Sequence, residues 1–242
     1  MGRKPALQVD QSGQSAAITR ATAVYERLRA DISDGLLAPG SKLRVESISA
    51  RYGVGASPLR EALSRLSAEG LVFRNDQRGF SVAPLDFDEL PILTDTRVRL
   101  ESMALRDAIE HRNREWEDRL VLLIHRLGRT TRSINAEKHR PNPEWENLHR
   151  DFHRALLATC PSRWLREYCD KLADEAYRLR QLAVSQGPSK RDIHGEHLAI
   201  FEAAIAGASE KAVALLAGHY RRTADRVAQA AKRFKPRGVL AQ

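Results

Sequence analysis

The 242-residue chain has only two cysteines and lacks a long hydrophobic run, and these shortages exclude several classes of protein. The spacing of Cys160 and Cys169 fits neither a disulfide framework nor a zinc finger, so we expect two buried packing residues in a reducing cytosol. No apolar run approaches the roughly 20 residues that span a bilayer. The polar N-terminal stretch is unlike a signal peptide. We therefore expect a cytoplasmic protein without a membrane partner.

The motifs of common enzyme classes are missing as well. The sequence contains no His-Glu-x-x-His zinc-protease pattern, no P-loop, no Gly-x-Gly-x-x-Gly and no nucleophile elbow. His149 and His153 are four residues apart, but Arg150 rather than a glutamate follows the first of them. The histidines of the C-terminal half leave a metal-dependent enzyme as an alternative, and the sequence favours a protein that is not an enzyme.

Positive charge is in excess, with 40 Lys and Arg against 31 Asp and Glu and a net charge of +9. Basic side chains that meet phosphates release counterions, which favours a polyanionic partner such as double-stranded DNA. The excess is divided almost equally between residues 1–85 and 86–242, so charge alone does not show which half contacts DNA.

Residues 18–85 show the element order of a winged helix-turn-helix. Apolar spacing predicts the helices, with Ser57 as an N-cap and Pro58 in the first helical position. A polar tip between two short apolar runs predicts a β-hairpin. The expected elements are helices at 18–35, 45–52 and 57–70 and strands at 71–73 and 80–82, after a flexible tail at 1–17.

Residues 88–234 have a helical pattern throughout, followed by a second tail at 235–242. Proline, glycine and asparagine divide this region into helices near 88–111, 113–138, 143–159, 162–185, 189–206 and 209–233. Consecutive helices without strands predict an antiparallel bundle. The expected fold is mainly α: a winged helix-turn-helix with a small β-hairpin wing, followed by an all-α domain for effector binding and dimerisation.

The predicted second helix of the pair would enter the major groove of DNA, with the hairpin beside it. Gly53 allows a sharp turn between the helices, and a helix N-terminus at Ser57 suits a phosphate. Arginine can bind a guanine or a phosphate through two hydrogen bonds. Ordinary solvated helix charges are the alternative for any one arginine. The candidate DNA-binding residues are Lys42, Arg44, Gly55, Ala56, Ser57, Pro58, Arg60, Arg65, Gln77, Arg78 and Gly79.

Four histidines of the C-terminal half lie on the apolar faces of three predicted helices. They are His149, His153, His197 and His219. Imidazole is a common ligand of divalent transition metals such as Zn²⁺ or Ni²⁺. Taken singly, each histidine fits a packed core residue equally well, whereas four together indicate a metal site.

The stretches Ser57–Leu63, Glu69–Val72 and Arg78–Val82 resemble the GntR family of bacterial regulators. The resemblance covers residues 18–85 and implies a dimer that recognises a short, near-palindromic operator. Members often carry Ser-Arg or Thr-Arg before the Ser/Thr-Pro, where this chain has Gly55-Ala56. Base recognition would then depend more on Arg60, Arg65, Lys42, Arg44 and backbone contacts.

The C-terminal half resembles the helical FCD domain of the FadR subfamily, through the stretches Arg97–Glu101, Phe152–Leu156 and Glu196–Ile200 and through His219. The resemblance implies a metal held by one Asp and three His, with a carboxylate effector beside it. His149 stands at the Asp position. The amino-acid sequence of residues 53–66 and 149–156 is similar to that of a subgroup of regulators that control glutarate and 4-aminobutyrate breakdown. This resemblance implies a repressor that is released by glutarate or a related dicarboxylate.

A dicarboxylate needs cations in a shielded pocket, and arginine can bind a carboxylate through two hydrogen bonds. The candidate effector-binding residues are Arg97, Arg178, Arg180 and Tyr177. Salt bridges are the alternative for the arginines, and packing is the alternative for Tyr177. An architectural DNA-binding dimer without an effector is the alternative for the whole chain.

Overall fold

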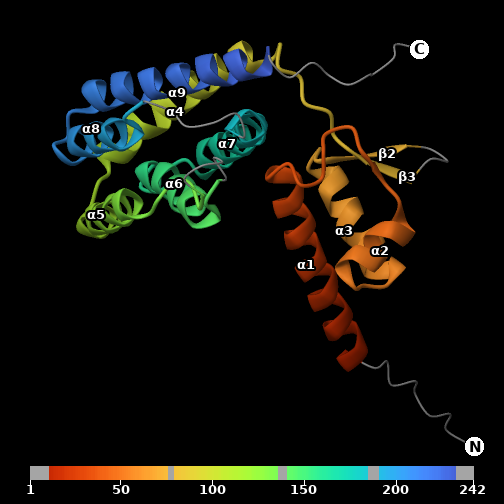
Figure 1. The fold of residues 1–242 in the computed structure, drawn as a ribbon. Coiled ribbons are helices and arrows are strands. Elements are labelled where there is room, and N and C mark those ends of the chain that lie inside the picture. The colour runs from red at the N-terminus through yellow and green to blue at the C-terminus, as the bar shows by residue number, and fades with distance from the viewer. Residues whose placement is uncertain (1–10, 76–78, 136–140, 185–190, 233–242) are drawn as a thin grey trace, which may run out of the picture. The chain divides into compact units, whose positions relative to one another are not determined.

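The computed structural model describes residues 11–75, 79–135, 141–184 and 191–232. The chain divides into two compact units, Met1–Leu85 and Asp86–Gln242 (Figure 1). In the part of the chain that is described, no helix has both the length and the apolar character needed to cross a membrane.

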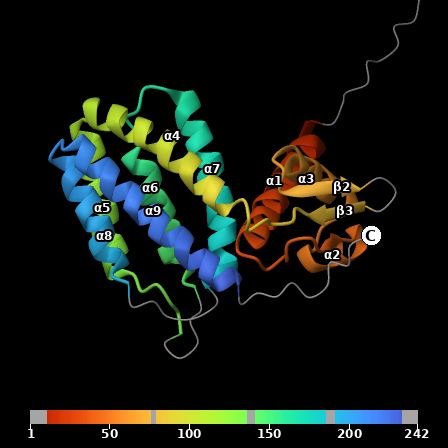
Figure 2. The same cartoon turned by 90° about the horizontal axis from the view of Figure 1, so that it is seen from above.

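The first unit combines helices with a small antiparallel sheet. Its elements are α1 (Gln11–Ser33), β1 (Lys42–Leu43), α2 (Val45–Tyr52), α3 (Ala56–Ala68), β2 (Val72–Asn75) and β3 (Gly79–Val82). The strand order is β1-β3-β2, with Lys42 opposite Ser81 and Val72 opposite Val82. Helices α1 and α3 pack against each other (Figure 2). Leu28 and Leu63 are buried in the core of this unit. The predicted winged helix-turn-helix is confirmed.

Two local expectations for this unit are corrected, and one strand was missed. Helix α1 begins at Gln11, so residues 11–17 are helical rather than part of a tail. Helix α3 begins at Ala56 with Gly55 as its N-cap, and the Ser57 side chain makes no cap hydrogen bond because it already lies inside the first turn. Strand β1 was not predicted, since two residues are too few to show a period of two.

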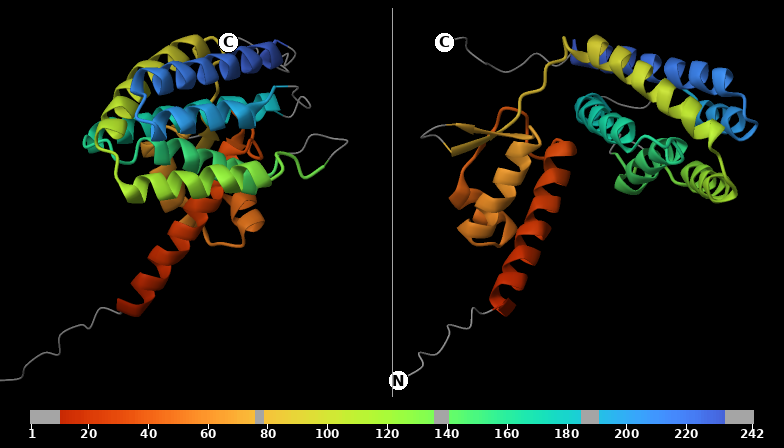
Figure 3. Two further views of the ribbon diagram at one scale, coloured as in Figure 1. Left: turned by 90° about the vertical axis from the view of Figure 1, so that its left-hand side faces the viewer. Right: turned by 180° about the vertical axis from the view of Figure 1, so that it is seen from behind.

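The described residues of the second unit form six helices. They are α4 (Leu90–Glu110), α5 (Arg114–Arg129), α6 (Pro143–Leu156), α7 (Arg163–Val184), α8 (Ile193–Ile205) and α9 (Ser209–Ala231). Helices α4 and α9 lie side by side and run in opposite directions, α8 packs on α9, and α7 contacts both α4 and α9 (Figure 3). Helices α5 and α6 form a further pair. The predicted mainly α fold with an antiparallel bundle is confirmed.

The core of this unit is apolar and includes both cysteines. Phe152 and Leu156 of α6 are fully buried, and Trp116 of α5 donates a hydrogen bond to the carbonyl of Ala155. Cys160 and Cys169 are buried thiols that form no disulfide. The prediction that both cysteines are packing residues is confirmed.

Helix α5 ends at Arg129, nine residues before its predicted end at 138. The Thr130 hydroxyl donates to the carbonyl of Arg126, and the Ser133 hydroxyl bonds the backbone of Asn135. Hydroxyl side chains compete in this way with helical backbone hydrogen bonds. Ser133 also pairs with Pro141 in an isolated bridge, so the chain turns here instead of continuing the helix.

Candidate functional site

The N-terminal end of α3 and its surroundings form an exposed polar surface. The predicted DNA-binding residues that are exposed are Lys42, Arg44, Gly55, Ala56, Ser57, Arg60, Arg65 and Gly79, while Pro58 is half-buried. Gln77 and Arg78 lie outside the described residues. Gly53 adopts a left-handed conformation with φ of 66°, which makes the sharp turn from α2 into α3. This turn leaves the first backbone N–H groups of α3 at the surface, where they can bind an anion.

The two predicted arginines of α3 differ in their contacts. Arg65 donates to the Thr22 hydroxyl at 3.3 Å, and its guanidinium lies 4.0 Å from the centre of the Tyr25 ring. Arg60 is exposed and makes no hydrogen bond or ion pair with any other described residue. The five-residue spacing places the two side chains on different faces of the helix. Both arginines are exposed, and Arg60 is the one without a contact to another described side chain.

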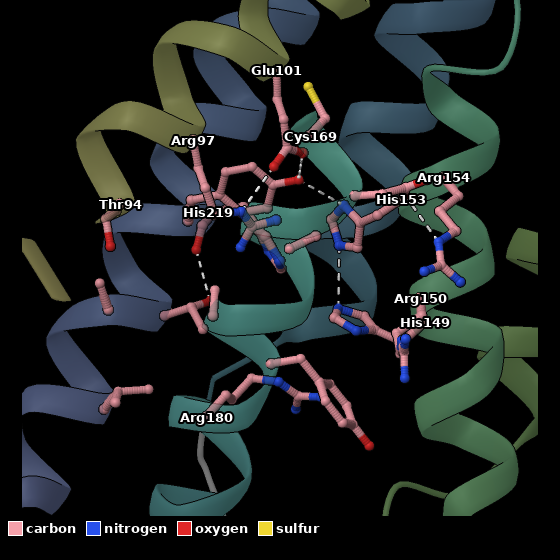
Figure 4. Close-up of a pocket in the computed structure, with 18 of the residues that line it drawn as sticks. Thr94, Arg97, Glu101, His149, Arg150, His153, Arg154, Cys169, Arg180 and His219 are labelled. Atoms are coloured by element: carbon pink, nitrogen blue, oxygen red, sulfur yellow. Dashed lines mark hydrogen bonds and ion pairs between the residues drawn. The ribbon is translucent and has the colours of Figure 1, made fainter. Parts of the chain in front are cut away.

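In the second unit, the four predicted histidines come together. His149 and His153 extend from α6, His197 from α8 and His219 from α9, and one nitrogen of each lies within 4.8 Å of the others. Figure 4 shows His149, His153 and His219 at this site. His197 is fully buried, and His219 is 3% exposed. Burial lowers the pKa of His149, His153 and His197 well below 6.5, and it lowers the pKa of His219 to about 4 although Glu196 opposes this. Neutral imidazoles are the form that binds metals.

Hydrogen bonds fix the tautomers of two of these rings. The Tyr220 hydroxyl donates to Glu101, so it accepts from Nδ1–H of His153 at 3.1 Å. Burial raises the pKa of Tyr220 well above 10, which keeps this hydroxyl protonated. Nδ1 of His219 lies 2.9 Å from a carboxylate oxygen of Glu196 and donates to it. Both rings therefore keep the lone pair of Nε2 for another partner.

The cluster offers the donor atoms of a metal site. Nε2 of His153 lies 3.2 Å from Nε2 of His149, and two nitrogen ligands of one tetrahedral zinc ion are about 3.3 Å apart. Both ring nitrogens of His197 are buried without a hydrogen-bond partner. A buried polar atom without a partner is costly, and a metal ion would satisfy one of these nitrogens. Asp151 is exposed, so His149 rather than a carboxylate completes the set.

A cavity of about 840 Å³, part of it open to solvent, adjoins the histidines (Figure 4). Helices α4, α6, α7 and α9 line it. Every arginine of its lining has a carboxylate partner. The pairs are Arg97 with Glu101, Arg150 with Asp174, Arg154 with Asp170 and Arg180 with Glu146. The cavity thus combines polar groups with an apolar wall, as small-molecule sites do.

Three of the four predicted effector-binding residues line this cavity. Arg97, Tyr177 and Arg180 do so, and the guanidinium of Arg180 lies 5.3 Å from the centre of the Tyr177 ring. Arg178 is absent from the lining, and its guanidinium pairs with Glu175 at 2.9 Å. Residues 178 and 180 are two apart and therefore lie on different sides of α7.

Sequence reasoning missed several residues that support the histidines. Tyr220 and Glu196 hold the rings of His153 and His219, and Glu101 accepts from Tyr220. Arg150 was also missed, and its guanidinium lies over the Tyr177 ring at 4.8 Å. The only signal in the sequence was that two of these residues adjoin a predicted histidine, since Tyr220 follows His219 and Glu196 precedes His197. The long-range contacts themselves have no sequence pattern.

Comparison with known families agrees with this division into two units. Residues 20–82 match the family described as bacterial regulatory proteins, gntR family, and residues 93–222 match the FCD domain. The chain belongs to the GntR family. It is a ligand-responsive DNA-binding transcriptional regulator and not an enzyme, and the second unit contains its FCD domain.

Individual relatives of this GntR-family regulator agree with that assignment. The chain is 40% identical to the uncharacterized HTH-type transcriptional regulator BphR of Paraburkholderia xenovorans, over 81% of this chain and 80% of the relative. It is 34% identical to the HTH-type transcriptional repressor GlaR of Escherichia coli, over 81% and 90%. Among solved structures, E. coli McbR/YncC matches with a TM-score of 0.72 at 21% identity, over 88% of this chain and 98% of that one, which shows a common fold.

Proposed function

We propose that this regulator is a cytoplasmic repressor that releases its operator when a small dicarboxylate, such as glutarate, binds in the FCD domain. The observation that carries the proposal is the convergence of four imidazoles, three of which (His149, His153 and His219) line a cavity, in a chain that also has a winged helix-turn-helix. The relative GlaR is named a repressor, which supports the direction of the effect.

The proposed DNA-binding surface is the exposed N-terminal end of α3 with β1 and the wing. Arg60 would contact a base edge or phosphate in the major groove, and Lys42 and Arg44 would contact the adjacent backbone. Gly55 and Ala56 have no long side chain, so the chain would approach DNA there through its backbone. A homodimer would present two such surfaces, and its two-fold symmetry calls for a near-palindromic operator.

The proposed metal ligands are His149, His153, His197 and His219, and the ion would be Zn²⁺ or Ni²⁺. When bound, the ion supplies a divalent positive centre that attracts a carboxylate. Since all four ligands are neutral imidazoles, they leave its double charge uncompensated. Tyr220 and Glu196 orient two of the rings.

The remaining walls of the cavity would hold the effector. Arg97 and Arg180 would donate hydrogen bonds to it, and the Tyr177 ring lies against the guanidinium of Arg180. The protein would have one conformation that binds DNA and one that does not. The effector lowers the operator affinity only if its own affinity is higher for the conformation that does not bind DNA. The proposed repression therefore requires two conformations of the dimer with different affinities for glutarate.

Fluorescence anisotropy on an operator fragment selected from a random library tests this function. We expect saturating glutarate to weaken operator binding of the metal-loaded full-length protein by about 5- to 150-fold, the usual range of allosteric coupling. Pentanoate, which has one carboxylate on the same five-carbon chain, should have a smaller effect. An operator affinity that glutarate and related dicarboxylates leave unchanged would contradict the proposal.

A further inference from the structure

A second cavity of about 450 Å³ adjoins the histidine cluster, and four arginines line it. Arg132 precedes α6, Arg180 belongs to α7, Arg191 precedes α8 and Arg226 belongs to α9. No acidic side chain is among the described residues that line this cavity. Four arginines from four separate segments therefore line one cavity, and gathering their charges is costly unless negative charge compensates them.

Nearby carboxylates compensate only part of this positive charge. Glu146 pairs with Arg180, and Glu196 pairs with Arg191 while also accepting from Arg222 and His219. Arg132 forms no ion pair within the described part of the chain, and its Nε is buried without a hydrogen-bond partner. The second cavity thus differs from the first, in which each arginine of the lining has a carboxylate partner.

The acid–base properties of these arginines agree with an excess of positive charge. Burial, together with the neighbouring Arg180, lowers the pKa of Arg132 to about 10. Burial and Arg191 lower the pKa of Arg226. A nearby anion would stabilise the charged form of both side chains.

The two cavities meet at the histidine cluster. His149, His219 and Arg180 line both of them. The Trp145 ring stacks on His149 with 4.8 Å between ring centres, and the guanidinium of Arg132 lies 4.9 Å from the Trp145 ring centre. The two cavities therefore share part of their walls at the histidine cluster, and the Arg132 guanidinium lies one ring beyond His149.

We propose that this arginine-lined cavity is a second anion subsite, and that it binds the far carboxylate of the effector while the near carboxylate lies at the histidine cluster. This inference rests on the proposed function, and it makes Arg132 a specificity residue for dicarboxylates over monocarboxylates. The planar guanidinium of Arg132 suits a carboxylate, and its charge has no ion-pair partner among the described residues.

Calorimetric titration of the metal-loaded full-length protein with glutarate and with pentanoate tests the subsite. The two ligands share a five-carbon chain and differ only at the far end. We expect Arg132→Gln to weaken glutarate binding about ten- to one-hundredfold, the cost of losing a charged hydrogen bond. Pentanoate binding should stay within about twofold, because the near carboxylate keeps its contacts. Arg119→Gln, at an exposed position of α5, is the matched control and should change neither affinity.

Two outcomes would overturn the subsite: glutarate binds Arg132→Gln as tightly as the wild type, or Arg132→Gln weakens both ligands equally. Metal content and the circular dichroism melt are measured alongside. If Arg132→Gln does not fold, Arg132→Lys replaces it, and the same selective loss for glutarate is expected because lysine lacks the planar donor pair.

A thermal-shift series separates this inference from the proposed function. Sulfate should stabilise the wild type more than chloride at equal ionic strength, and Arg132→Gln should lose that difference. If sulfate shows this dependence while no dicarboxylate binds, the assignment to an effector carboxylate is overturned. If glutarate binds with the expected dependence on Arg132 but leaves the operator affinity unchanged, the subsite is supported and the proposed function fails.

Discussion

Arg60 is an exposed arginine of α3 without a partner among the described residues, and it is the side chain that tests the DNA-binding surface most directly. We expect Arg60→Ala to weaken operator binding by about 1–3 kcal/mol, or roughly 5- to 150-fold, because a bidentate contact is lost. Electrophoretic mobility shift on the selected operator measures the change. Glutarate affinity should be unaltered, and an operator affinity equal to the wild type would remove Arg60 from the proposed surface.

At the same scale, His153 tests the histidine cluster. Its Nε2 lies 3.2 Å from that of His149, and Tyr220 holds its other nitrogen. We expect His153→Ala to lower the affinity for Zn²⁺ or Ni²⁺ by more than about tenfold, since loss of even an outer-shell partner has an effect of that size. Metal content by mass spectrometry and competition with a chelating dye measure it. His125→Ala, at an exposed position of α5, is the control.

If His153→Ala retains the wild-type metal affinity while the variant stays folded, the four histidines are packing residues. The missing hydrogen-bond partner of His197 would then need another explanation.

At the scale of elements, the turn between α2 and α3 depends on one glycine. Gly53 has φ of 66°, and nothing lies within 4 Å of the position of an added Cβ. Gly53→Ala should therefore destabilise the winged unit through backbone conformation alone, by about 1–2 kcal/mol. Urea unfolding measures the free energy. Gly55→Ala is the control, because its φ of −71° suits any residue and its Cβ would meet only Pro58 at 3.9 Å.

Equal unfolding free energies for Gly53→Ala and Gly55→Ala would contradict this account of the turn. A larger loss for Gly53→Ala would show that the left-handed conformation, rather than the added volume, limits the residues allowed here.

At the scale of the whole molecule, effector and operator binding must be linked if the proposed function holds. Binding free energies are reciprocal, so the factor by which glutarate weakens operator binding equals the factor by which operator weakens glutarate binding. We expect calorimetry with and without saturating operator to return the same factor as fluorescence anisotropy. If the glutarate affinity is the same with and without operator, the two units act independently.

The sequence alone determined the fold class and the identity of the four clustered histidines. Helical periodicity, glycine stops and the order of elements depend on local chemistry, and an i, i+4 pair such as His149 and His153 shares a face in any helix. The exact ends of the helices were harder to predict, because side-chain hydroxyls compete with helical backbone hydrogen bonds there. The hydroxyls after Arg129 end α5 early, and the first turn of α3 includes Ser57 instead of being capped by it.

Only the tertiary structure decided which polar side chains meet. Glu101 and Tyr220 are 119 residues apart, and Arg180 and Glu146 are 34 apart, yet both pairs form hydrogen bonds. The structure also placed Arg132 in a cavity with three other arginines and put Arg178 outside the first cavity. The periodicity of one helix shows which of its faces is apolar, but which helix covers that face depends on the packing of all of them.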